Sequence, residues 1–271
     1  MRLINLEPGR SGRMLLNALP FVLLLIVYVI ASDARLQANP NDKLLPSFAT
    51  IAHKVGELVS EADKRTGHIL LWADTLASLK LLLTGVGVSA FFGLFIGMLN
   101  GAIPLFRSVM SPLTTVISLI PPMAILPILF ISFGLGDLAK IMLIIIGICP
   151  FIIRDIQQST RAIPSEIIVK SLTLGANTFQ ILSRVILPQI MPRLFEAVRL
   201  TLGSAWLFLI SAEAIAANQG LGYRIFLVRR YLDMSVILPY VVWITALAFT
   251  MDLILRVSSR KLFAWYYKGG K

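Results

Sequence analysis

The sequence predicts an all-α polytopic membrane protein with about six transmembrane helices. Of its 271 residues, 57% are hydrophobic and only 14% are charged, and the mean hydropathy is +0.82. A soluble domain of this length exposes far more polar surface, so part of the surrounding solvent must be lipid. Apolar runs separated by polar breaks then predict helices long enough to cross a bilayer.

The expected spans are apolar runs bounded by charged or Gly- and Pro-containing segments. They cover Met14–Ala31, Leu76–Ala102, 109–133, 139–153, 194–217 and 236–256. Arginines precede the first run, as they do in a signal peptide, but a run of about 18 residues suits a retained helix better. Residues 33–75 form a polar loop, in which an apolar stripe over 48–59 predicts an amphipathic helix that lies on the outer membrane surface or against the bundle.

The second expected span carries a stripe of glycines. Gly93, Gly97 and Gly101 recur every fourth residue, so they lie on one face of the helix. Small residues on one face let another helix approach closely in lipid. We therefore predict that this face packs against a second helix of the bundle.

Prolines interrupt the third expected span. Proline removes backbone hydrogen bonds, which is tolerated at membrane depth only where protein or water satisfies the freed carbonyl groups. A bent helix facing a cavity is one interpretation and simple packing is the other. Glu213, near the outer end of the fifth span, is either a functional group or a hydrogen-bond anchor for the glycine-rich loop after it. The candidate pathway or gate residues are Pro121, Pro122, Pro127, Ser204, Trp206 and Glu213.

The charge distribution predicts the orientation. The net charge is +11, but the basic residues are scattered between apolar spans, which argues against nucleic-acid binding. Placing both termini in the cytoplasm puts most Lys and Arg on the cytoplasmic side, as membrane proteins prefer. Within the helices we expect Asp252 to pair with Arg256 and Asp155 to pair with Arg154.

Three regions follow from this pattern. Residues 1–75 hold the first helix and the outer loop, residues 76–256 form the core bundle, and residues 257–271 are a basic cytoplasmic tail.

The largest break between spans, residues 154–193, predicts a cytoplasmic helical hairpin. Glu166–Leu174 has a helical pattern, Gly175 provides a stop, and Asn177 or Thr178 can cap a second helix that ends at Pro188. The two helices are too polar to span the membrane and too apolar for free water. They either dock into a groove of a cytoplasmic partner or cover the inner face of their own bundle.

This hairpin resembles the signature loop of the permease subunits of binding-protein-dependent ABC importers. That signature begins with Glu-Ala-Ala, which is followed by three residues and a glycine. Nine residues after the glycine come Ile, any residue and Leu-Pro. Gly175 and Val185-Ile186-Leu187-Pro188 fit its spacing, with Val185 at the Ile position, whereas Val169-Lys170-Ser171 replaces Glu-Ala-Ala. The resemblance implies an ATPase-docking loop that includes Lys170, Ser171, Gly175, Ala176, Arg184, Leu187 and Pro188.

Two further segments resemble the taurine, sulfonate and nitrate importer branch of these permeases. They are Pro121-Pro122-Met123-Ala124-Ile125-Leu126-Pro127, followed by Phe133-Gly134-Leu135-Gly136, and the stretch from Ala212 to Tyr223. The likeness implies a type I importer permease bundle in the bacterial cytoplasmic membrane. It also implies a small solute such as a sulfonate, nitrate or another small oxyanion.

The resemblance implies the partners as well: a second permease copy in a homodimer, two cytoplasmic ATPase subunits and an extracytoplasmic substrate-binding protein. ATP and Mg would be bound by the ATPases, because this chain has no Gly-x-x-x-x-Gly-Lys-Ser/Thr run. We expect no catalytic residue, no metal site and no bound cofactor in the chain. The alternative is a channel or secondary transporter subunit that works without an ATPase.

Overall fold

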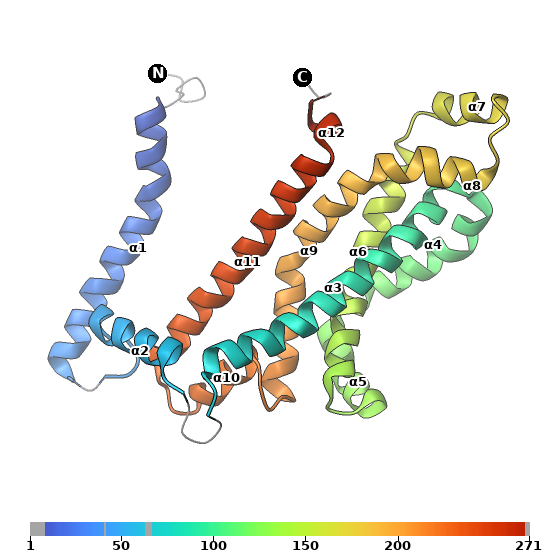
Figure 1. The fold of residues 1–271 in the computed structure, drawn as a ribbon. Helices are drawn as coiled ribbons and strands as arrows, with labels where there is room; N and C mark the ends of the chain where they lie inside the picture. Colours follow the sequence, from blue (N-terminus) through green and yellow to red (C-terminus); the bar gives the residue numbers. More distant parts are fainter. Residues whose placement is uncertain (1–8, 41, 63–66, 269–271) are drawn as a thin grey trace. The chain divides into compact units, whose positions relative to one another are not determined.

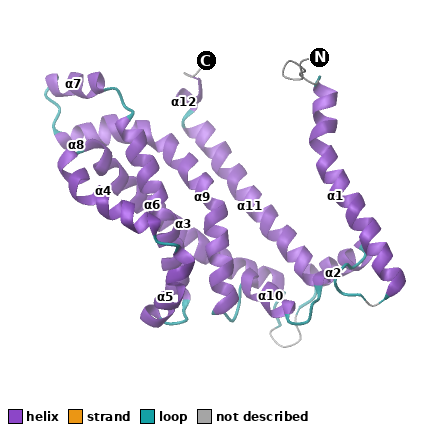
Figure 2. Ribbon diagram, turned by 180° about the vertical axis from the view of Figure 1, so that it is seen from behind, coloured by secondary structure: helices purple, strands orange, loops and turns teal. Residues whose placement is uncertain are grey.

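The computed structural model describes residues 9–40, 42–62 and 67–268, and the described residues contain helices and no strands (Figures 1 and 2). The all-α prediction is confirmed. The helices are α1 Arg10–Ala38, α2 Phe48–Ser60, α3 Leu70–Ala102, α4 Pro104–Leu119, η2 Pro122–Ile125, α5 Leu126–Phe133, α6 Asp137–Arg161, α7 Ser165–Thr173, α8 Thr178–Gln180, η3 Ile181–Ile186, α9 Leu187–Ile215, α10 Leu221–Arg229, α11 Met234–Leu262 and α12 Ala264–Lys268.

Among the described residues, four helices are long and apolar enough to cross a membrane, or five spans if one bent pair counts as a span. The four are Gly12–Ala38, Leu70–Ala102, Thr178–Ile215 and Met234–Leu262. The remaining predicted span, residues 139–153, lies inside α6, which packs in the middle of the bundle. The chain forms two compact units, residues 1–61 with 228–239, and residues 62–227 with 240–271.

In the first unit, α1 and the segment after it are joined by side-chain hydrogen bonds. Tyr28 donates to the carbonyl of Pro46 at 2.7 Å, and Ser32 donates to that of Leu45 at 2.9 Å. Ser47 caps α2 by accepting a hydrogen bond from the N–H of Thr50. The helix predicted from the apolar stripe over 48–59 is therefore present as α2. Its position, on the outer membrane surface or against the bundle, stays a prediction.

The core of the second unit is the contact between α3 and α6, the most extensive between any two helices, and α9 packs against both (Figure 1). Small residues recur at every fourth position of α3, and β-branched residues recur at every fourth position of α6. All of them are buried: Gly85, Ser89, Gly93, Gly97 and Gly101 on α3, and Ile144, Ile148, Ile152, Ile156 and Thr160 on α6.

The close approach of α3 and α6 requires these glycines. A Cβ atom at Gly97 would lie 2.8 Å from Cβ of Ile156, and one at Gly85 would lie 2.8 Å from Cγ2 of Ile144. Carbon atoms in contact normally stay about 3.5–4.0 Å apart. The predicted packing role of the glycine stripe is confirmed.

The third expected span is bent at its prolines. It begins earlier than predicted, at Pro104, and its two parts, Pro104–Leu119 and Pro122–Phe133, meet at 83°. Pro121 interrupts the helical hydrogen bonds, and the chain continues through the short η2 helix into α5.

The predicted helix end at Pro188 is wrong. The chain stays helical from Thr178 to Ile215, and Pro188 lies in the first turn of α9. Proline fits because the helix widens into the π-helix η3, in which the N–H of Leu187 donates to the carbonyl of Leu182, five residues earlier. The side-chain amide of Gln189 donates to the carbonyl of Val185 at 2.9 Å. The fifth span therefore begins well before the predicted residue 194.

Candidate functional site

The turn between α7 and α8 is held by local hydrogen bonds. Gly175 has a φ of 82°, a left-handed conformation that favours glycine. Its N–H donates to the carbonyl of Leu172 at 2.9 Å, and the N–H of Ala176 donates to that of Ser171 at 3.1 Å. This pair of bonds is the Schellman arrangement that ends a helix at a glycine. The predicted stop is confirmed.

A capping box begins the next helix. The Asn177 side chain accepts from the N–H of Gln180 at 2.8 Å, and the Gln180 side chain accepts from the N–H of Asn177 at 2.9 Å. Because both sides of the turn are fixed, the hairpin formed by residues 165–186 presents one defined shape.

The hairpin exposes large apolar side chains. Leu174 is 84% exposed and Phe179 is 76% exposed, and no residue of α7 is buried. Among the residues implied for docking, Lys170, Gly175, Arg184 and Pro188 are exposed, whereas Ser171, Ala176 and Leu187 are half-buried. An exposed apolar surface of this kind marks a contact with another molecule.

A buried polar cluster lies where α3, α9, α10 and α11 meet. Three consecutive backbone N–H groups at the start of α10 each find a side-chain acceptor. The N–H of Gly220 donates to Asp74 at 2.9 Å, that of Leu221 to Ser78 at 2.8 Å, and that of Gly222 to Glu213 at 2.8 Å. These groups have no partner inside the helix, and negative charge is favoured at a helix N-terminus.

Glu213 is completely buried and anchors the loop before α10. Its second oxygen accepts a hydrogen bond from Ser78 at 2.7 Å. A Cβ atom at Gly220 would lie 2.5 Å from the Glu213 carboxyl carbon, and one at Gly222 would lie 2.6 Å from the carbonyl oxygen of Ile210. Both glycines are therefore needed for the loop to approach Glu213. The geometry is that of the anchor interpretation, and a gating role for Glu213 stays a prediction.

Asp74 is the centre of the same cluster. Besides Gly220, it accepts hydrogen bonds from Arg224 Nε at 2.8 Å and from the Tyr240 hydroxyl at 3.3 Å, and it is 1% exposed. Burial lowers the pKa of Arg224, but the hydrogen bond and the charge of Asp74 outweigh that effect and raise it above its usual value. The buried carboxylate is thus paired and hydrogen-bonded, as burial requires.

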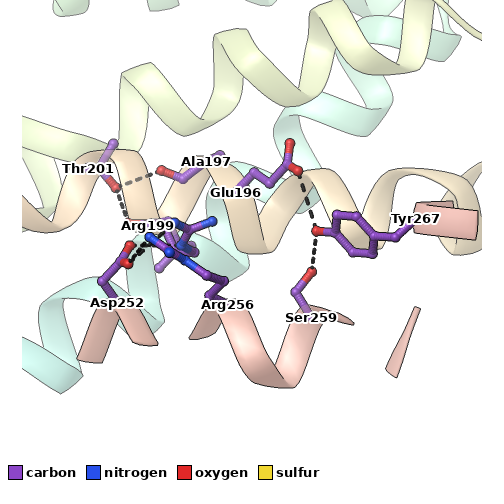
Figure 3. A network of polar contacts seen from close by, with 9 residues as sticks. Glu196, Ala197, Arg199, Thr201, Asp252, Arg256, Ser259 and Tyr267 are labelled. Atoms are coloured by element: carbon purple, nitrogen blue, oxygen red, sulfur yellow. Dashed lines mark hydrogen bonds and ion pairs between the residues drawn. The ribbon is translucent and has the colours of Figure 1, made fainter. Parts of the chain in front are cut away.

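A second polar cluster joins α9 to α11 and α12 (Figure 3). Asp252 accepts from Arg256 at 2.8 Å, as predicted, and also from Arg199 of α9 at 2.8 Å. Tyr267 donates to Glu196 of α9 at 3.4 Å. The cluster ties the last turns of α11 and the short α12 to the middle of the continuous helix Thr178–Ile215.

The expected pair of Asp155 with Arg154 is wrong. Neighbouring residues on a helix point in different directions, so they do not face each other. Asp155 lies 3.5 Å from Arg193 of α9, whereas Arg154 points to α4, where its Nη1 lies 3.4 Å from Oγ of Ser118.

The remaining candidate pathway residues do not form one cluster with Glu213. Pro121, Pro127 and Ser204 are exposed and Pro122 is half-buried. Trp206 is enclosed by the bundle at 4% exposure, and its indole N–H has no hydrogen-bond partner among the described residues. Their roles in a pathway stay predictions.

Sequence reasoning missed Ser78 as a partner of Glu213, Asp74 as the centre of that cluster, and Arg199 as a second partner of Asp252. Asp74 falls at the end of the polar segment 33–75, just before the second expected span, and Ser78 and Tyr240 carry no charge signal. The sequence signal for Asp74 was a carboxylate at the start of an apolar run, which is costly without a partner.

No group of three or more His, Cys, Asp or Glu side chains in the described parts of the chain is placed to hold a metal ion.

Residues 89–264 match the family described as "Binding-protein-dependent transport system inner membrane component". The chain is 32% identical to the taurine transport system permease protein TauC of Escherichia coli (strain K12), over 84% of this chain and 79% of that protein. It is 28% identical to the bicarbonate transport system permease protein CmpB of Synechococcus elongatus (strain ATCC 33912 / PCC 7942 / FACHB-805), over 68% of this chain and 66% of that protein.

A solved structure of the MetNI methionine ABC transporter in an inward-facing conformation matches with a TM-score of 0.56 and 26% identity. The match covers 68% of this chain and 93% of that chain.

Proposed function

Because the chain belongs to the family of binding-protein-dependent transport system inner membrane components, it is an ABC importer permease, and we propose that two copies enclose the pathway between them. The solute reaches them from an extracytoplasmic binding protein, and two separate ATPase chains supply the energy. The proposed orientation places both termini and the α7–α8 hairpin in the cytoplasm. Within the second unit, the end of α11 and the hairpin lie at the same end (Figure 1).

The observation that carries this proposal is the exposed apolar surface of the rigid hairpin. Leu172, Leu174 and Phe179 stand exposed beside Lys170 and Arg184. Covering these side chains with a groove of the ATPase removes apolar area from water. Each Å² removed stabilises the complex by about 25 cal/mol. A hairpin fixed by a Schellman turn and a capping box loses little conformational entropy when it docks.

The transported solute is a small oxyanion, such as a sulfonate or nitrate. This substrate class is supported by the likeness to permeases named for taurine and bicarbonate transport. Taurine carries a sulfonate group and bicarbonate is itself a small oxyanion. The ligand of the cognate binding protein tests the class directly, through a binding screen of sulfonates, nitrate and bicarbonate.

Docking is tested by co-purification of the full chain with its cognate ATPase. We expect Phe179→Asp and Leu174→Asp to lower ATPase retention about tenfold or more, because each places a charge in an apolar groove. Leu262→Asp is the matched control: Leu262 is 65% exposed at the end of α11, outside the hairpin. Equal retention of all three variants contradicts the docking role. Solute flux through the purified chain alone, without ATP, contradicts the importer proposal and supports a channel.

A further inference from the structure

A polar cavity of about 540 Å³ lies between α4 and α6. Small-molecule sites in proteins typically have volumes of about 300–1,000 Å³. Ser111, Thr114 and Thr115 of α4 line one side of it, and Arg154 and Arg161 of α6 line the other. The cavity is near the hairpin end of the second unit, since α6 leads directly into α7 (Figure 1).

The lining of this cavity is positively charged without compensation. Gln157, Gln158 and Ala162 complete it, so no carboxylate is among the lining residues. Neither Arg154 nor Arg161 forms an ion pair within the described residues. The neighbouring carboxylate, Asp155, points away from the cavity toward Arg193.

The two arginines can act on one ligand. They are seven residues apart on α6, two helical turns, so they share a face and their Cα atoms are separated by about 10 Å along the axis. Both side chains are long, and Gln157 and Gln158 lie between them with amide groups that donate hydrogen bonds. Thr114 and Thr115 donate their hydroxyl protons to the Ser111 carbonyl, so the α4 wall adds polarity and no charge.

We propose that this cavity is a binding site for an oxyanion group, a phosphate or a sulfonate, held by Arg154 and Arg161. Guanidinium groups pair with such oxygens through two parallel hydrogen bonds, and they prefer phosphate and sulfonate groups to neutral ligands. The absence of a carboxylate from the lining excludes a metal cation as the ligand. Two sources offer this chemistry at the membrane surface: a free anion from solution and the phosphate of a lipid headgroup.

The site does not depend on the proposed transport cycle, because it is defined by the lining of a single chain. The test uses the full chain in phosphatidylcholine nanodiscs, with no ATPase present. In the first arm, equilibrium dialysis measures the binding of radiolabelled sulfate and phosphate. In the second arm, the nanodiscs also contain phosphatidylglycerol, and native mass spectrometry measures how strongly this anionic lipid is retained compared with zwitterionic phosphatidylcholine.

Arg154→Gln and Arg161→Gln remove one guanidinium each and keep a polar side chain. Hydrogen bonds to charged groups contribute about 1.5–3 kcal/mol, which corresponds to roughly a tenfold to hundredfold loss of affinity for each variant. Arg260→Gln is the matched control, because Arg260 is an exposed arginine of α11 that does not line the cavity. Thermal unfolding of each variant verifies that it is folded.

Weaker binding of the free anions in the two cavity variants, with no change in the control, identifies a site for a soluble oxyanion. The same pattern for phosphatidylglycerol alone identifies a lipid-phosphate site. If the cavity variants bind both kinds of ligand as the control does, the proposal is wrong. If the docking test above fails but the cavity variants still lower oxyanion binding, the docking proposal is wrong and the oxyanion site remains supported.

Discussion

Replacing Gly97 with alanine should force α3 and α6 apart. The new Cβ atom would lie 2.7 Å from the Ile153 carbonyl oxygen and 2.8 Å from Cβ of Ile156. The first neighbour is backbone and cannot rotate away, so the two helices must separate by several tenths of an ångström along the glycine stripe. Overpacking of this kind costs about 1–3 kcal/mol.

Alanine also forms helix more readily than glycine, which offsets about 0.5–1 kcal/mol of that cost. The expected net loss for Gly97→Ala is therefore roughly 0–2.5 kcal/mol in the free energy of unfolding. Gly87→Ala, in the same helix, is the matched control. A Cβ atom at Gly87 would meet nothing within 4 Å, so this variant should keep the propensity gain alone.

The single cysteine of the chain provides the assay. Cys149 is 8% exposed on α6, the partner of the glycine stripe, so it reacts with a thiol-reactive fluorophore only when the bundle opens. Each kcal/mol shifts the unfolding midpoint by about 2–4 °C in a protein of this size. We expect the midpoint of Gly97→Ala to fall below that of Gly87→Ala. A midpoint equal to or above that of the control would refute the packing argument.

Two further substitutions test the ends of the bundle. Glu213→Gln keeps an acceptor for Ser78 but faces the N–H of Gly222 with a second donor, so the free energy of unfolding should fall by about 1–3 kcal/mol in the same thiol assay. An unchanged midpoint would show that the loop before α10 is held by other contacts. Gly175→Ala places a side chain at a φ of 82°, which costs about 1–2 kcal/mol and distorts the hairpin. ATPase retention should fall while the unfolding midpoint of the bundle stays the same, and the reverse result would refute a local role.

Local patterns in the chain were sufficient for the elements near the hairpin. The end of α7 at Gly175 and the cap at Asn177 depend on the conformation and side chains of adjacent residues, so both follow from residue type and order. Pro188 shows the limit of such rules. Proline ends most helices, but here the π-helical widening of residues 181–186 and the amide of Gln189 accommodate it. That adjustment has no reliable signature in the residue pattern.

Long-range polar partners were beyond the reach of the sequence. Asp74 and Arg224 are 150 residues apart, and Arg199 and Asp252 are 53 apart. Hydropathy indicates that a buried charge needs a partner, but it does not identify the partner. For Asp155, proximity along the chain suggested Arg154, and the helical geometry selected Arg193 instead. Because Asp155 pairs with Arg193, Arg154 has no carboxylate partner among the described residues and lines the cavity together with Arg161.

The sequence by itself determined that the chain is a helical membrane protein, where most helices lie, and that one face of α3 is built from small residues. These properties depend on composition, on helical periodicity and on capping residues, which act over a few residues. The tertiary structure decided which helix packs against the glycine stripe and which side chains accept hydrogen bonds from the N–H groups at the start of α10. It also decided which arginines remain without an ion pair among the described residues. Those outcomes depend on contacts between distant segments, and such contacts form only when the helices pack against one another.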